Sequence, residues 1–119
     1  MTRSIGISLF LLLIAAMPGV AADIDGTWKG TLSGGGPAIF KLKADGATVT
    51  GTMLGPDGKD KRIIVGKVKG NEISFSVDLE WEGMPVMLLV KGTISGNEMR
   101  LRMDADNGYW GTDAVVTKQ

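Results

Sequence analysis

The sequence predicts an all-β protein, an antiparallel up-and-down meander of about eight strands that closes into a barrel. Three observations indicate this fold. A ten-residue phrase occurs twice, apolar and polar residues alternate along most of the chain after residue 23, and no window in that part shows a helical period. Strict alternation is the signature of half-buried strands, and short connections favour a meander over any βαβ arrangement.

The repeated phrase is GKVKGNEISF at 66–75 and GTISGNEMRL at 92–101. In each copy Gly-Asn separates two alternating runs, which is typical of a two-residue β-hairpin loop because both residues tolerate the positive φ of primed turns. Pairing outward from the loops sets Gly66 opposite Phe75 and Gly92 opposite Leu101 on the apolar face. Each glycine is expected to leave room for its large partner and to let the strand coil, as in sheets that bend into barrels.

The same test predicts the other strands and the core. The strands are 27–32, 38–43, 48–54 and a last one from Tyr109 to Thr117, with turns at 34–37, 45–46, 55–58 and 106–108. An open meander would leave two unpaired edges, and closure into a barrel removes both. The residues predicted to fill the barrel are Trp28, Phe40, Met53, Phe75, Met99 and Met103.

The first 22 residues have the layout of a cleaved secretory signal peptide. A basic Arg3 precedes an apolar run at 5–16, and small residues stand before Asp23. The run of about twelve residues is shorter than the roughly twenty of a spanning helix. We therefore predict cleavage after Ala22, a single β-barrel domain at 23–119 without a membrane span, and export to the periplasm or the medium. An uncleaved amino-terminal anchor is the alternative.

The composition excludes several kinds of catalytic and metal-binding site. The formal net charge is zero, and the chain contains neither histidine nor cysteine. Zero net charge predicts no nucleic-acid partner. Without imidazole or thiol there is no Ser-His or Cys-His nucleophile and no zinc site built on those ligands. The sequence therefore predicts no cofactor, no metal and no enzymatic activity, and a fold that relies on its core without disulfide bonds.

GTWKGTL at 26–32, followed by an apolar strand and by DGATVTGTM at 45–53, resembles the opening of the lipocalin and avidin group of up-and-down barrels. The resemblance implies that Trp28 plugs one end of a calycin-type barrel. The ligand residues of avidins are not matched, because Gly30 stands where their first-strand Asn is expected and Met53 where a Tyr is expected. The resemblance thus implies the architecture, without biotin binding.

Carboxylates are the remaining candidates for chemistry. Asp78, Glu80 and Glu82 alternate along one strand, so that neighbours lie roughly 6.5–7 Å apart on one face. That spacing is within the range of glycosidase carboxylate pairs, although a solvated outer face explains it as well. The segment 104–108, DADNG, lacks the twelve-residue spacing of a calcium loop and is better explained as a hairpin turn.

Aromatic residues near strand ends are the candidates for binding. The residues predicted to line an apolar site at the barrel mouth are Trp81, Met84, Tyr109 and Trp110, and capping of the core is the alternative. The predicted register points four apolar residues outward, as a homodimer surface: Ile63, Val65, Met87 and Leu89. A local error in that register is the alternative.

These observations favour an exported small barrel that binds a small apolar or amphipathic molecule at its mouth. A second hypothesis is a non-enzymatic interaction module, such as an inhibitor of a secreted hydrolase or an envelope component, that uses exposed loops such as 55–60. A third and less favoured one is a carboxylate-based hydrolase relying on Glu80, Glu82 or Asp104.

Overall fold

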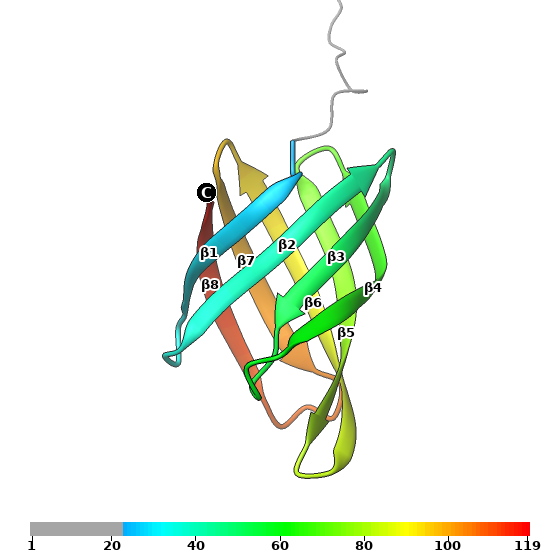
Figure 1. The fold of residues 1–119 in the computed structure, drawn as a ribbon, viewed down its shortest axis with the longest axis vertical. Helices are drawn as coiled ribbons and strands as arrows, with labels where there is room; N and C mark the ends of the chain where they lie inside the picture. Colours follow the sequence, from blue (N-terminus) through cyan, green and yellow to red (C-terminus); the bar gives the residue numbers. More distant parts are fainter. Residues whose placement is uncertain (1–22) are drawn as a thin grey trace, which may run out of the picture.

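The computed structural model describes residues 23–119, which form eight antiparallel strands closed into one barrel in chain order (Figure 1). The strands are β1 (Gly26–Leu32), β2 (Pro37–Asp45), β3 (Thr48–Leu54), β4 (Asp60–Lys69), β5 (Glu72–Trp81), β6 (Met84–Ser95), β7 (Glu98–Ala105) and β8 (Gly111–Lys118). Each strand pairs with the next, and β8 returns to β1, where Trp28 lies opposite Lys118. The predicted all-β class, meander order and closed barrel are confirmed.

The last strand begins later than predicted. β8 starts at Gly111, so Tyr109 and Trp110 belong to the loop before it. The predicted signal peptide, 1–22, lies outside the described residues. Within 23–119 no helix has the length and apolarity needed to cross a bilayer.

Side chains from all eight strands fill the barrel. The six residues predicted to lie inside, Trp28, Phe40, Met53, Phe75, Met99 and Met103, are all buried. Phe40 and Phe75 meet edge to face, with ring centroids 5.9 Å apart, a geometry that the ring quadrupole favours. Trp28 is completely buried, and its indole N–H donates to the carbonyl of Ile24 at 3.0 Å. The ammonium of Lys118 lies 5.9 Å from the centre of the Trp28 ring and covers it from outside.

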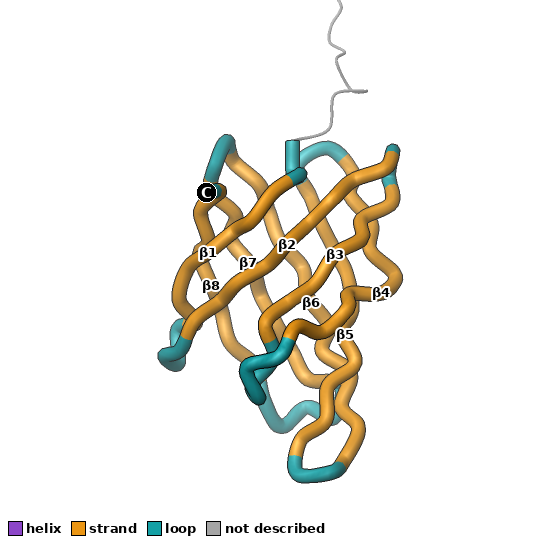
Figure 2. Tube along the Cα trace, in the orientation of Figure 1, coloured by secondary structure: helices purple, strands orange, loops and turns teal. Residues whose placement is uncertain are grey.

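The two ends of the barrel differ (Figure 2). At one end, the turn end, the connections are the pairs 46–47, 70–71 and 96–97. The first residue of each pair is a glycine with φ of 61° or 62°, whereas no asparagine has positive φ. That is the pattern of a type II′ turn, which needs glycine at its first loop position. At the other end, the loop end, lie the longer connections 33–36, 55–59 and 106–110 and the β5–β6 hairpin. The loop end is therefore where the chain departs most from a minimal barrel.

The two copies of the repeated phrase pack differently. Gly92 lies opposite Leu101 as predicted, and a Cβ at Gly92 would overlap the Leu101 side chain. At Gly66 the register shifts between Ile64 and Lys67, so that two residues of β4 face Phe75. A Cβ at Gly66 would overlap the carbonyl of a β3 residue, so this glycine makes room for the neighbouring backbone and not for Phe75.

The same bulge overturns the predicted orientation of Ile63. An extra residue in one strand of a pair inverts the alternation beyond it. Ile63 consequently points into the barrel and is 4% exposed, so its place in an outer surface was wrong. Val65 and Leu89 are exposed and Met87 is partly exposed, as an outward direction requires.

Val65 holds the strained backbone of this bulge, with φ of 52° and a side chain that is 68% exposed. Left-handed backbone is a genuine outlier for a β-branched residue, and asparagine tolerates it better. We expect Val65→Asn to raise the free energy of unfolding by about 1 kcal/mol, measured by urea denaturation. Val115→Asn, at an exposed strand position without positive φ, is the control and should not stabilise. Equal effects of both changes would contradict strain at Val65.

Candidate functional site

A two-stranded arm projects from the loop end of the barrel (Figure 1). β5 pairs with β6 over its whole length, from Glu72 to Trp81. The β4–β5 ladder ends at Val77, and the β6–β7 ladder ends at Leu88. Residues 78–87, the arm, therefore form ladder pairs only with one another. A two-stranded ribbon is marginally stable by itself, so other contacts must support it.

The arm has an apolar inner face, which continues the interior face of the barrel. Alternation from the buried Val77 places Leu79 and Trp81 on this face, and they lie directly opposite Val86 and Met84. Leu79 packs against the core. Farther out, Trp81 is 57% exposed and Met84 is 66% exposed. The arm thus carries apolar side chains from the core into solvent.

The β7–β8 loop holds the arm at its base. Asp106 donates its backbone N–H to the carbonyl of Met87 at 2.8 Å, and its carboxylate accepts the N–H of Met87 at 3.2 Å. Ala105, the last residue of β7, donates to the carbonyl of Trp110 at 2.9 Å, and within the loop Asn107 accepts the N–H of Tyr109 at 2.9 Å. The loop is therefore a structured turn hydrogen-bonded to the arm.

The four predicted ligand-binding residues lie on these two connected segments. Trp81 and Met84 belong to the arm, whereas Tyr109 and Trp110 belong to the loop that holds it. Tyr109 is 91% exposed and Trp110 44% exposed. The loop end therefore carries four large exposed side chains on two hydrogen-bonded segments, and exposed apolar side chains of this size are favourable for a partner molecule to cover.

The interior at the loop end has a small polar group among small side chains. Thr112, at the start of β8, is buried, and its hydroxyl lies 2.9 Å from that of Ser33. Ser33 also accepts the backbone N–H of Asp113 at 3.2 Å. Ala38 and Ala105 are the buried residues of β2 and β7 at this end. Thr112 is therefore a buried hydroxyl whose hydrogen bonds are made within the protein, whereas Ser33 is exposed.

The acidic residues singled out in the sequence lie apart from this apolar surface. Asp78 and Glu80 are exposed, opposite Met87 and Pro85, on the face of the arm that alternates with the apolar one. Glu82 is in the turn at the tip of the arm, with φ of 51°. In the part of the chain that the structure describes, no three acidic side chains converge on a position for a metal ion.

Asp104 is engaged in an ion pair. Its carboxylate accepts a hydrogen bond from Arg102 at 2.8 Å, which lowers the pKa of Asp104 below its ordinary value. The carboxylate of Asp106 accepts a hydrogen bond from the backbone N–H of Met87, and the amide oxygen of Asn107 accepts one from the backbone N–H of Tyr109. This segment therefore behaves as a turn whose polar atoms stabilise the loop.

Sequence reasoning missed the arm and the role of Asp106. The feature that marks the arm is the length of β6, which has 12 residues, whereas its neighbour β7 has 8. Asp106 gave no signal, because its hydrogen bonds join residues that are distant in sequence. The chain matches no protein-family model, no curated protein and no solved structure.

Proposed function

We propose that this protein is an exported, non-enzymatic barrel that binds a small apolar or amphipathic molecule at its loop end, against the inner face of the arm. The observation that carries the proposal is the exposure of Trp81, Met84, Tyr109 and Trp110 on two segments that are hydrogen-bonded to each other. Because the interior is filled by the core, the ligand is placed at the mouth and not within the barrel.

The apolar area of these side chains is large enough to contribute a useful free energy of binding. A half-exposed Trp leaves about 100 Å² of apolar surface in water, and its burial contributes about 2.5 kcal/mol. Covering Trp81, Met84 and Trp110 together would contribute several times that amount, which is needed to offset the loss of translational and rotational freedom on binding. The hydroxyl of the exposed Ser33 would suit a ligand with a polar end.

The resemblance to lipocalins and avidins supports the same proposal. The Gly-x-Trp motif resembles that of those families, and the closed meander with a buried Trp28 on its first strand is compatible with a calycin-type barrel. Biotin is not the proposed ligand, because Gly30 cannot be replaced by the Asn of avidins. A Cβ at Gly30 would overlap the carbonyl of Val115 on β8.

A second candidate is an interaction module that docks on another protein through the arm. The projection of the arm beyond the barrel favours it, because protruding hairpins suit insertion into a concave partner. The two candidates differ in the residues that they require. A small molecule would contact both Trp81 and Trp110, whereas a protein partner would contact the tip of the arm.

A neutral apolar fluorophore, phenylnaphthylamine, tests the small-molecule proposal. We expect its fluorescence to rise on binding, and Trp81→Ala and Trp110→Ala each to weaken binding by about tenfold through loss of apolar contact. Leu89→Ala is the matched control, because Leu89 is 45% exposed on the outer face of β6, like Trp110 at 44%.

Two results would contradict the proposal. One is absence of fluorophore binding, together with a mass spectrum of the protein from its own host that shows no bound small molecule. The other is an equal loss of binding in Leu89→Ala, which would indicate nonspecific binding of the fluorophore to exposed apolar side chains. A tryptophan dependence of capture by a protein, without fluorophore binding, would support the docking arm instead.

A further inference from the structure

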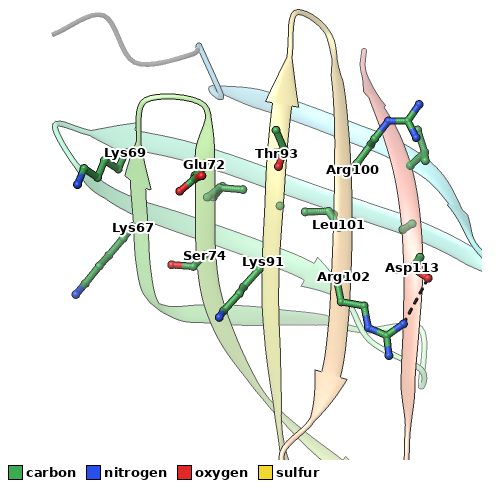
Figure 3. A pocket seen from close by; sticks show the side chains of 14 residues that line it. Lys67, Lys69, Glu72, Ser74, Lys91, Thr93, Arg100, Leu101, Arg102 and Asp113 are labelled. Carbon is green, nitrogen blue, oxygen red and sulfur yellow. Dashed lines mark hydrogen bonds and ion pairs between the residues drawn. The ribbon is translucent and has the colours of Figure 1, made fainter. Parts of the chain in front are cut away.

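A second surface lies on the outside of the barrel, around the strands β4 to β8. It is an open groove of about 820 Å³, the basic groove, lined by five cationic side chains and two carboxylates (Figure 3). The cationic residues are Lys67, Lys69, Lys91, Arg100 and Arg102, and the acidic ones are Glu72 and Asp113. The surplus of positive charge is local, because the whole chain has a formal net charge of zero.

Register places five of these positions in one row across the sheet. Lys67 lies opposite Ser74, and Ser74 lies opposite Lys91. Lys91 in turn lies opposite Arg102, and Arg102 opposite Asp113. Adjacent strands are about 4.8 Å apart, so the two lysines start about 10 Å from each other with the Ser74 hydroxyl between them. In Figure 3 Lys67 and Lys91 extend to the same side of the sheet.

The charges in this row are unbalanced. Opposite charges across neighbouring strands stabilise a sheet, whereas like charges directly opposite each other destabilise it. Lys91 and Arg102 are such a like-charged pair. Arg102 is compensated by Asp104 at 2.8 Å and Asp113 at 3.4 Å. Among the described residues no carboxylate forms an ion pair with Lys67, Lys69 or Lys91.

We propose that the basic groove binds the phosphate group of a phosphorylated ligand, held over Ser74 between Lys67 and Lys91. The two ammonium groups supply charge and hydrogen-bond donors, and their flexible stems allow both to converge on one phosphate. The Ser74 hydroxyl, from the strand between them, donates a further hydrogen bond to a phosphate oxygen. An anion in this place also supplies the negative charge that Lys67 and Lys91 lack among the described residues.

Glu72 is the residue of the groove whose neutralisation should change anion binding in the direction opposite to neutralisation of the lysines. It lies two residues before Ser74 on the same face of β5 and lines the same groove. Its carboxylate opposes a bound anion, so its neutralisation should tighten binding. The site is separate from the apolar loop end, because it is built from outward-facing residues toward the turn end of β4 to β7. The proposal therefore does not depend on the one made for the arm.

Pyrophosphate titrated by calorimetry at low salt is the first test. We expect Lys67→Gln and Lys91→Gln each to weaken binding by about tenfold, Ser74→Ala by roughly threefold and Glu72→Gln to strengthen it by roughly threefold. Lys43→Gln is the charge-matched control, on the outer face of β2, and should change binding by less than about twofold. All variants are surface changes, and their melting temperatures verify folding.

Vesicles distinguish a free phosphate from one in a lipid headgroup. Phosphatidylglycerol in phosphatidylcholine vesicles should displace pyrophosphate if the natural source is a membrane lipid, and should leave its binding unchanged if the source is a soluble phosphate; both results support the site. Failure of both probes to bind would overturn the proposal. So would an equal loss in Lys43→Gln and Lys91→Gln with no effect of Ser74→Ala, because diffuse charge would then explain the binding.

Discussion

Replacing Trp28 by alanine is expected to lower the free energy of unfolding by about 4 kcal/mol. Trp28 is completely buried at the turn end, where it donates to the carbonyl of Ile24 and packs beneath Lys118. Its removal leaves a cavity the size of an indole and an unpaired carbonyl in one step. Urea denaturation followed by circular dichroism measures the loss. Trp28→Phe retains part of the ring, and we expect it to cost less, about 2 kcal/mol.

Trp81→Ala is the matched control for this prediction. Trp81 is 57% exposed at the loop end, so its removal is expected to cost less than about 1 kcal/mol. If Trp28→Ala and Trp81→Ala destabilised the protein equally, the assignment of one tryptophan to the core and the other to a binding surface would be wrong.

Gly51→Ala is expected to cost about 3 kcal/mol, the second-largest effect of a single substitution. Gly51 has φ of 146° and lies opposite Leu42 on β2. A Cβ there would overlap the carbonyl of Lys41, so the neighbouring strand must move. The strained backbone alone costs roughly 1–2 kcal/mol, and displacement of a paired strand adds to it. The midpoint and slope of urea denaturation give the value.

Gly92→Ala provides the comparison, because its added Cβ would overlap the end of the Leu101 side chain and would meet a backbone atom, the carbonyl oxygen of Arg100, no closer than 3.0 Å. A side chain can rotate away, whereas a backbone carbonyl in a ladder cannot. We therefore expect Gly92→Ala to be milder than Gly51→Ala. A larger loss at Gly92 would show that the core around Leu101 is less adaptable than the β2–β3 ladder.

The hairpin registers were predictable because their information is local. Gly70-Asn71 and Gly96-Asn97 fix the loop length, and alternation then fixes which side chains point inward. The turn type was less certain from sequence, since both residues tolerate positive φ but only the glycines adopt it. Closure of the barrel followed from the number of strands and the cost of free edges.

The β4 bulge and the two surfaces were harder to predict. Ile63-Ile64-Val65 are three apolar residues in succession, so alternation alone does not say which of them points inward, and only Ile63 proves to be buried. The identities of the exposed aromatic residues could be read from the sequence, whereas the arm that carries Trp81 and Met84 depends on where the neighbouring ladders end. Predicting the basic groove from sequence requires the register of four strand pairs, and an error in any one of them would displace the row of charged residues.

The pairing of β1 with β8 has a consequence for how the barrel forms. Seven of the eight strand pairs join neighbours in the chain, so each closes a short loop at little entropic cost. The seam between Trp28 and Lys118 instead joins strands from the two ends of the described chain. Its contacts have the greatest sequence separation, and such contacts slow folding. We therefore expect the hairpins to form first and the seam beside the buried Trp28 to close last.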